Sequence, residues 1–328
     1  MILALETSCD DTCAAVVTHA GELRSNVVSS QGVHDRFGGV VPEWASRHHL
    51  ELVNAVVDDA LSRARVSLDD IDLVAVTQGP GLVGALLVGV ATAKGLAASR
   101  RLPLAAVDHL QGHVAANFLA PDPFEPPFVC LLASGGHTLL ARVRDHAGYE
   151  TVGRTLDDAA GEAFDKGARL LGLGYPGGPA LSALAARGDR AAFAFPTGAR
   201  VAGLDFSFAG LKTALLYKVR ELGPRETERR AADLAASYEH AIVSALIARA
   251  ERALAAEAEP RLAIGGGVAA NRLLRERALA LDVPVHVPAP ELCTDNAAMI
   301  GSAARWVPPR AFPDYLALDA YATRRRAA

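Results

Sequence analysis

Residues 2–17 read Ile-Leu-Ala-Leu-Glu-Thr-Ser-Cys-Asp-Asp-Thr-Cys-Ala-Ala-Val-Val, two apolar runs on either side of a polar turn. Residues 128–143 read Phe-Val-Cys-Leu-Leu-Ala-Ser-Gly-Gly-His-Thr-Leu-Leu-Ala-Arg-Val and repeat this order with a different turn. Apolar runs of this length around small and polar residues are typical of a β-hairpin. We therefore expect two hairpins of the same kind, one in each half of the chain.

A second pattern also occurs twice, namely an apolar strand followed by a glycine-rich turn and a helix. Residues 73–82 read Leu-Val-Ala-Val-Thr-Gln-Gly-Pro-Gly-Leu, and residues 262–271 read Leu-Ala-Ile-Gly-Gly-Gly-Val-Ala-Ala-Asn. Two copies of one order of elements indicate duplication, and they predict an α/β fold of two similar lobes facing a cleft. Both turns follow strands, where open α/β sheets bind ligands.

The boundary between the lobes is expected in residues 121–127, where four of seven residues are proline. The first lobe would then comprise residues 1–122 together with about 303–328. The second lobe would comprise residues 123–302 and would be lengthened by a helical insertion at about 155–256.

Three helices are expected in the second half of the chain. Residues 157–171 place Ala160, Ala163, Phe164 and Gly167 on one face, as in an amphipathic helix. Further helices are expected at about 226–256 and at 295–305, the last of which must cover the face of a sheet.

The composition is that of an ordinary globular protein, with 328 residues, 51% hydrophobic residues and a net charge of −4. This charge excludes a global positive field for nucleic acids, so any RNA must be attracted by a local patch or by a partner. The longest apolar run, residues 81–93, is too short to span a bilayer. We expect no signal peptide, no membrane contact, reduced cysteines and a cytoplasmic location.

His109 and His113 follow an apolar strand and are four residues apart. On a helix this spacing places both imidazoles on one face, one turn apart, so that both rings can reach one metal ion. The alternative is a pair of partly exposed helix histidines. Asp295, at a strand-to-helix junction, either caps a helix or supplies a third ligand. Two histidines and one carboxylate with open positions suit Fe(II) or Zn(II).

The glycine turns and several acidic residues are further candidates. Residues 265–270 can present backbone amides to an anion, and with Glu291 they also fit a loose dinucleotide-binding pattern. Asp10 and Asp11 in the first hairpin turn either orient a metal or accept a proton, or they are simply good turn residues. Asp165 lies near the apolar face of its helix, so we expect it to bind a ligand.

The chain resembles one family over nearly its whole length, from Leu5 to about Gly301. The motifs occur in that family's order: Leu-Glu-Thr-Ser-Cys-Asp-Asp-Thr, Gly-Gly-Val-Val-Pro-Glu, His-Leu-Gln-Gly-His, Ser-Gly-Gly-His-Thr, Asp-Asp-Ala-Ala-Gly-Glu-Ala-Phe-Asp-Lys, Tyr-Pro-Gly-Gly-Pro, Gly-Leu-Lys-Thr and Gly-Gly-Gly-Val-Ala-Ala-Asn. They resemble the bacterial TsaD/Gcp family of tRNA adenosine threonylcarbamoyltransferases.

The resemblance implies a duplicated fold of the actin, sugar-kinase and heat-shock ATPase type. It also implies transfer of a threonylcarbamoyl group from threonylcarbamoyl-AMP to the exocyclic amine of the adenosine beside a tRNA anticodon, in tRNAs that read codons beginning with A. A paralogous dimer partner and a small ATPase partner are implied as well.

The resemblance also assigns residues. Matched to the family's motifs, His109, His113 and Asp295 would bind the metal, described as iron and sometimes zinc. Asp10 and Asp11 match an acidic turn near the reaction centre. The donor adenylate would be held by Leu132, Ala133, Ser134, Gly135, Gly136, Asp165, Gly178 and Asn271.

Two positions depart from the family's pattern. Gln111 replaces a glutamate that is not a ligand, so metal binding should survive while the charge near the metal changes. Asp11 replaces a glutamate and shortens that carboxylate by one methylene.

Four other interpretations compete with this one. A metal-dependent peptidase would need a glutamate directly after the first histidine, where Leu110 stands. A nucleotide-binding ATPase or kinase follows from the fold alone, which is a weak argument. A dinucleotide-binding enzyme would leave the histidine pair unexplained. A scaffold without activity would not need both histidines and Asp295.

Overall fold

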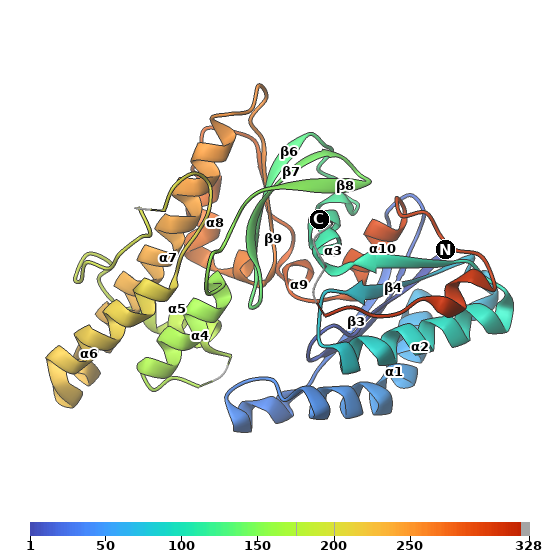
Figure 1. Ribbon diagram of the computed structural model, residues 1–328, viewed down its shortest axis with the longest axis horizontal. Helices are drawn as coiled ribbons and strands as arrows, with labels where there is room; N and C mark the ends of the chain where they lie inside the picture. Colours follow the sequence, from blue (N-terminus) through green and yellow to red (C-terminus); the bar gives the residue numbers. More distant parts are fainter. Residues whose placement is uncertain (175, 200, 323–328) are drawn as a thin grey trace. The chain divides into compact units, whose positions relative to one another are not determined.

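The computed structural model describes residues 1–174, 176–199 and 201–322, and the chain divides into two compact units (Figure 1). The first unit comprises residues 1–125, the turn 145–148 and the chain from Asp295 onward. The second comprises residues 126–144 and 149–294. Each unit has a five-stranded sheet and a hydrophobic core of its own.

The first sheet has the strand order β3-β2-β1-β4-β5. Strand β1 pairs antiparallel with β2 and parallel with β4, and β4 pairs parallel with β5. The strands are β1 Ile2–Glu6, β2 Asp11–Val17, β3 Leu23–Ser30, β4 Leu73–Gly79 and β5 Leu104–Asp108. The helices of this unit are α1 Pro42–Ala64, α2 Val83–Arg100, α3 His109–Ala115 and α10 Ala297–Ala304, with short 3-10 turns at Gly32–Phe37, Leu68–Asp70, Ala116–Phe118 and Asp314–Ala317.

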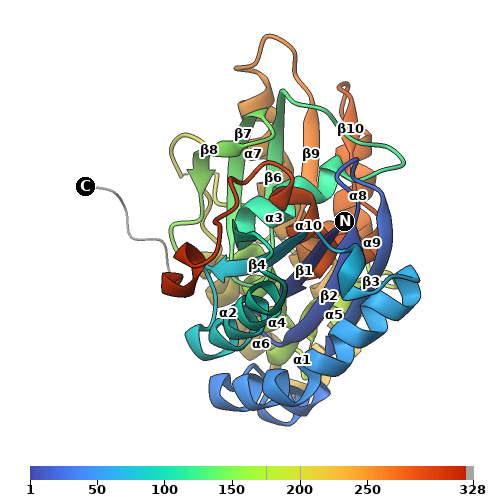
Figure 2. The same ribbon diagram turned by 90° about the vertical axis from the view of Figure 1, so that its right-hand side faces the viewer.

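Helices cover both faces of the first sheet (Figure 2). Leu3 and Leu5 of β1 share a core with α1 and α2. Ala4, which points to the opposite face, lies against Gly301 of α10. A side chain at Gly301 would lie 2.7 Å from Val17 of β2, so glycine allows α10 to pack directly on the sheet. This packing places the residues just before α10 at the ends of β1 and β5.

The second sheet repeats the first. Its strand order is β8-β7-β6-β9-β10, in which β6 pairs antiparallel with β7 and parallel with β9, and β9 pairs parallel with β10. The strands are β6 Phe128–Ala133, β7 Thr138–Asp145, β8 Gly148–Arg154, β9 Leu262–Gly265 and β10 Val285–His286. Each of these strands corresponds to one of β1–β5, so the structure confirms the two hairpins, the two later strands and the duplicated α/β fold.

The helices of the second unit lie between β8 and β9 and after β9. They are α4 Ala160–Leu170, α5 Gly177–Ala185, α6 Ala209–Arg229, α7 Ala231–Leu254, α8 Arg272–Leu279 and α9 Pro290–Cys293, with a 3-10 turn at Gly267–Ala270. The expected helix at 157–171 is α4. The expected single helix at 226–256 is wrong in its first turn, because the backbone leaves the helical conformation at Arg230, and residues 226–229 belong to α6.

The second unit ends at Thr294, whereas the sequence placed this boundary at about 302. The difference arises because α10, which begins at Ala297, packs on β1, β2 and α3 of the first unit. At the other boundary, the first unit extends to Glu125, three residues beyond the expected end. Residues 323–328, which the sequence assigned to the first lobe, lie outside the described residues.

Helix α2 is the one helix among the described residues that is long and apolar enough to cross a membrane. Its residues Ala85, Leu86, Val90, Ala93 and Ala97 are buried, and the helix packs on α1 and β4. This pattern is that of a helix covering the core of a domain.

Candidate functional site

His109 and His113 lie on one face of α3, which begins directly after β5. The Asp108 side chain caps this helix by accepting hydrogen bonds from the backbone N–H groups of Leu110 and Gln111. The two imidazole rings are 4.8 Å apart between centroids and are 6% and 1% exposed. They are therefore buried, which excludes the interpretation as partly exposed helix histidines.

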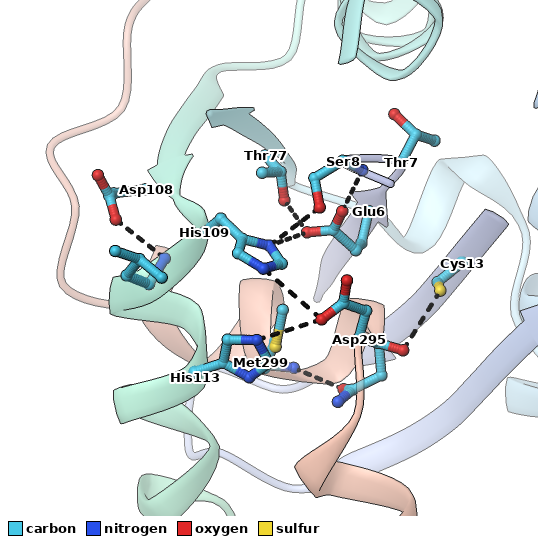
Figure 3. Close-up of polar contacts among 12 residues, drawn as sticks. Glu6, Thr7, Ser8, Cys13, Thr77, Asp108, His109, His113, Asp295 and Met299 are labelled. Carbon is cyan, nitrogen blue, oxygen red and sulfur yellow. Dashed lines mark hydrogen bonds and ion pairs between the residues drawn. The ribbon is translucent and has the colours of Figure 1, made fainter. Parts of the chain in front are cut away.

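Asp295 lies between α9 and α10 and completes a group of three (Figure 3). The cap of α10 is its neighbour Asn296, whose side chain accepts from the Met299 N–H, so the Asp295 carboxylate does not serve as that cap. Asp295 Oδ1 lies 3.2 Å from His113 Nε2 and 3.6 Å from His109 Nε2. The potential ligand atoms of the three residues lie within 4.8 Å of one another, so together they could hold a metal ion.

The hydrogen bonding of the two histidines fits this role. Among the described residues neither ring nitrogen of His113 makes a hydrogen bond of good geometry, although both are buried and Nε2 lies 3.2 Å from Asp295 Oδ1. A buried unpaired polar atom is costly, and coordination by Nε2 would satisfy it. His109 Nδ1 lies 3.0 Å from Glu6 Oε2 and 3.2 Å from Ser8 Oγ, which leaves Nε2 directed at Asp295. Metal-bound histidines commonly hold a carboxylate on their other nitrogen in this way.

Glu6 is the supporting residue that sequence reasoning missed. It ends β1, is fully buried, and accepts hydrogen bonds from the Thr77 hydroxyl at 2.5 Å and from the Ser8 N–H. Burial alone would raise the pKa of Glu6, but the charge and hydrogen bond of His109 lower it below its ordinary value. The signal in the sequence was a carboxylate directly after four apolar strand residues, where a charge must have a partner.

The charge of this site favours a cation. Burial lowers the pKa of His109, but the Asp295 and Glu6 carboxylates outweigh burial and raise it to about 9. Two carboxylates around two imidazoles therefore attract positive charge, either a proton or a metal ion.

Asp10 and Asp11 lie at the end of the turn that joins β1 to β2, which begins after Glu6. Asp10 is in the turn itself, and Asp11 is the first residue of β2, opposite Ser30 of β3. Burial raises the pKa of Asp11 to about 6, although a hydrogen bond with Ser30 lowers it, and the nearby Asp295 and Asp10 charges raise it further. Asp11 is thus a carboxylate able to exchange a proton near neutral pH.

Gln111 does not face the candidate metal ligands. A helix turns about 100° per residue, so Gln111 lies on the side of α3 opposite His109 and His113. Its Nε2 donates to the Ala147 carbonyl at 2.9 Å. The departure from the family's pattern at this position therefore changes the far side of the helix.

The predicted donor-binding residues lie in the second unit, beginning at the β6–β7 turn. Leu132 and Ala133 are fully buried in β6, backbone included, so the exposed part of the predicted site begins at the turn that follows. The turn that follows is closed by hydrogen bonds between Ser134 and His137. Gly161 of α4 donates to the Ser134 carbonyl at 3.1 Å, and a side chain at Gly161 would lie 2.6 Å from that oxygen. The absence of a side chain at Gly161 thus allows α4 to support the turn.

Asp165 links α4 to the start of α5. Its carboxylate accepts from the Gly177 N–H at 2.9 Å and from the Gly178 N–H. Burial raises the pKa of Asp165 above its ordinary value, although these two hydrogen bonds lower it. Asp165 and Gly178 are therefore neighbours, as expected for residues of one binding site.

Asn271 lies beside α5 as well. Its Oδ1 accepts from the Leu274 N–H and so caps α8, and its Nδ2 donates to Ser182 of α5 at 2.9 Å and to Glu239 of α7 at 2.7 Å. Sequence reasoning missed Ser182 and Glu239. The available signals were the spacing of Ser182 from Gly178, one helical turn, and a carboxylate within the largely apolar α7.

The turn at residues 265–270 is part of the same neighbourhood. Gly266 has φ +84°, and a side chain there would lie 2.4 Å from the Ala133 carbonyl, so glycine lets this turn approach the end of β6. The dinucleotide-binding alternative fails, because Glu291 is an exposed residue of α9 and the strand before it, β10, ends at His286.

The predicted site residues thus form two groups. His109, His113 and Asp295 gather in the first unit, where Asp10 and Asp11 also lie. The predicted donor-binding residues gather in the second unit, around α4, α5 and the ends of β6 and β9.

Comparisons with known proteins show which family the chain resembles. The model of the TsaD family, tRNA N6-adenosine threonylcarbamoyltransferase, matches residues 22–302. An enzyme of this name from Clostridium perfringens is 52% identical over 93% of this chain and 91% of its own length. One from Clostridium novyi is 48% identical over 92% of this chain and 91% of its own length.

Solved structures show the fold alone. HypF from T. kodakarensis has a TM-score of 0.60 at 16% identity and covers 92% of this chain and 46% of its own. Component A of (R)-2-hydroxyglutaryl-CoA dehydratase from Acidaminococcus fermentans has a TM-score of 0.56 at 14% identity, covering 93% and 96%. Given the family match and the identity to its curated members, this chain belongs to the tRNA N6-adenosine threonylcarbamoyltransferase family.

Proposed function

We propose that this protein transfers the threonylcarbamoyl group from threonylcarbamoyl-AMP to the exocyclic amine of the adenosine beside the anticodon, in tRNAs that read codons beginning with A. The observation that carries this proposal is 52% identity to a curated transferase over 93% of the chain. The buried group of His109, His113 and Asp295 supports it, because these residues match the metal motif of the family.

The transfer forms one bond and breaks one. The adenosine amine attacks the carbamoyl carbon, a nitrogen–carbon bond forms, and the bond from that carbon to the phosphate oxygen breaks. AMP leaves with the electron pair, so no ATP need be split for this step. The amine proton passes to a carboxylate, for which Asp11 is the candidate because its pKa of about 6 lies near neutrality.

His109, His113 and Asp295 would hold the metal ion, with Glu6 orienting His109. A divalent cation held there would supply Lewis-acid polarisation of the carbamoyl oxygen. Two histidines and one carboxylate favour Fe(II), and Zn(II) is the second candidate.

The donor nucleotide would bind the second unit, at the Ser134–Gly136 turn, Asp165, Gly178 and Asn271. The turn offers backbone groups without bulky side chains, and Asp165 holds the first turn of α5 through the Gly177 and Gly178 amides. The protein would act in the cytoplasm with a paralogous dimer partner and a small ATPase partner, which would help an acidic chain bind tRNA.

The activity is tested with purified protein, the two partner proteins, threonylcarbamoyl-AMP and unmodified tRNA. Mass spectrometry of the digested tRNA should show threonylcarbamoyladenosine at the position beside the anticodon. Unmodified tRNA after incubation with intact donor and all three proteins would contradict the proposed activity.

The metal site is tested separately by elemental analysis. His109→Ala should lose bound Fe or Zn because it removes one of three ligands. His48→Ala is the matched control, since His48 lies on α1 with its side chain 35% exposed and should leave metal content unchanged. Equal metal in wild type and His109→Ala would exclude this site.

A further inference from the structure

Glu239 occupies an unusual place for a carboxylate. It lies in the middle of α7, is 8% exposed, and has no basic partner among the described residues. Its Oε1 instead accepts two neutral hydrogen bonds, from the Ser182 hydroxyl at 2.6 Å and from Asn271 Nδ2 at 2.7 Å. A nearly buried carboxylate is costly, so its hydrogen bonds to these two side chains are a specific feature of the site.

We infer that Glu239 is a positioning residue that turns the side chains of Asn271 and Ser182 into hydrogen-bond acceptors for the ribose hydroxyls of the donor nucleotide. This inference rests on the proposed function, in which Asn271 and Gly178 belong to the donor site. Gly178 and Ser182 are four residues apart on α5 and therefore lie on one face of that helix.

The hydrogens and lone pairs that these side chains have left determine which ligand groups they can bind. Asn271 Nδ2 has two hydrogens, and both are used, one by Glu239 and one by Ser182 at 2.9 Å. The single hydroxyl hydrogen of Ser182 is directed at Glu239. The orientation of the Asn271 amide is fixed on its other side too, because its Oδ1 accepts from the Leu274 N–H at 2.9 Å. No donor of these two side chains is left for a ligand.

The hydrogen-bonding positions that Asn271, Ser182 and Glu239 have left for a ligand are all acceptors. Asn271 Oδ1 and Ser182 Oγ each keep one lone pair, and Glu239 Oε2 has no hydrogen-bond partner among the described residues. Phosphate oxygens are also acceptors, so they cannot form hydrogen bonds with these groups. Adjacent ribose hydroxyls each bring a donor hydrogen, so a vicinal diol matches this group. Without the carboxylate, the Ser182 hydroxyl would be free to rotate and one hydrogen of Asn271 Nδ2 would lose its acceptor, so both side chains could present donors instead.

The inference is tested by calorimetric titration of the full-length protein with three nucleotides. AMP carries both hydroxyls, 2′,3′-dideoxy-AMP lacks both, and IMP keeps the hydroxyls but lacks the exocyclic amine. Wild type should bind AMP about ten-fold or more tightly than the dideoxy analogue, because unpaired acceptors would be left with the latter. It should bind IMP about as well as AMP.

Three variants separate positioning from simple packing. Glu239→Ala should bring the ratio of the two affinities close to one, and in the transfer assay it should raise the donor KM with little change in kcat. Glu239→Gln should keep most of the ratio, because its amide oxygen can still accept from Ser182 and Asn271. If Glu239→Ala does not fold, as judged by circular dichroism, Ser182→Ala replaces it and should lower the ratio by removing one acceptor.

The outcomes distinguish this inference from the proposed function. AMP binding by wild type with no preference over the dideoxy analogue, or with a preference that the folded Glu239→Ala protein retains, overturns the role of Glu239 and leaves the transferase assignment intact. Selectivity against IMP instead would mean that the acceptors contact the base, which also overturns the inference. Absence of any AMP binding contradicts the donor site itself.

Discussion

The histidines of the candidate metal centre depend on a residue that is not a ligand. Glu6 fixes the ring of His109 through Nδ1. It is itself held by Thr77 of the neighbouring strand β4 and by the backbone N–H of Ser8 in the turn after β1. Such an arrangement orients Nε2 before any metal arrives, so less freedom is lost on binding.

Glu6→Gln should weaken metal affinity by about 10–100-fold, because the neutral amide cannot stabilise the His109 tautomer as the carboxylate does. Competition with a chromogenic chelator measures this change. Gln111→Glu is the control on the same part of the fold. It adds a charge on the opposite side of α3, so its affinity should equal that of wild type, and a gain or loss as large as that of Glu6→Gln would mean that general charge and not orientation controls binding.

We expect the rate of transfer to depend on pH through the carboxylate of Asp11. Its carboxylate must be deprotonated to accept the amine proton, and its pKa is raised to about 6. Transfer should therefore be fast above this pH and fall as the pH drops below about 6, by up to ten-fold per pH unit. Single-turnover rates between about pH 5 and 8 test this dependence, and Asp11→Asn should be slow and lack the acid limb. A folded Asp11→Asn protein with an unchanged profile would assign the proton transfer to another group.

At the scale of elements, the position of the proposed donor-binding turn depends on how closely α4 packs. Tyr238 of α7 donates to the Ala163 carbonyl at 3.0 Å, and its ring lies where a side chain on Gly167 would be. In the first turn of α4, Gly161 contacts the Ser134–Gly136 turn with its backbone. Helix α4 is thus held between α7 and the turn, and it has little room to move away from either.

Gly161→Ala should therefore displace the Ser134–Gly136 turn, since the new methyl group would lie 2.6 Å from Ser134 O and 2.8 Å from Gly135 Cα. The expected result is a donor KM raised by about ten-fold or more, with metal content unchanged. Gly210→Ala is the matched control, because Gly210 lies in the first turn of α6 with open space around its Cα. Equal KM values for the two variants would show that the turn does not contact the donor.

At the scale of the whole molecule, the two copies of the fold have acquired different chemistry at equivalent positions. The β1–β2 turn carries Asp10 and Asp11, whereas the corresponding β6–β7 turn carries Gly135 and Gly136. Acidic side chains suit a proton or a cation, and bare backbone suits a nucleotide. The same arrangement of strands occurs twice, and we propose that the different turns determine what each unit binds.

Hydrogen exchange should show whether the metal binds the first unit and the nucleotide binds the second. Because a ligand stabilises the state that binds it, Fe(II) should slow exchange in β1, α3 and α10, and AMP should slow it in α4, α5 and α8. Mass spectrometry of peptides from the full-length protein measures both effects. Protection of α5 and α8 by metal alone would contradict the separate location of the two groups of residues.

Local sequence patterns were enough to predict the two hairpins, the repeated strand and glycine turn, and the helix that carries both histidines. These features depend on hydrophobic periodicity and on turn residues within short segments, which can be recognised directly in the sequence. The pair of His109 and His113 was found for the same reason, whereas Asp295 was assigned as their partner by the resemblance to the family's motifs. Only the tertiary structure decided which residues support them.

Glu6 reaches His109 across 103 positions of the chain, and Glu239 reaches Ser182 across 57. Contacts between such distant positions leave no periodic trace in a single sequence, because they depend on how strands pair and helices pack. The boundary at Asp295 was missed for the same reason, since the packing of α10 on the first sheet, and not its composition, assigns it to the first unit. The sequence by itself therefore determined the duplicated order of strands and helices and the chemical groups of the candidate sites. The packing of distant segments decided how these groups are oriented.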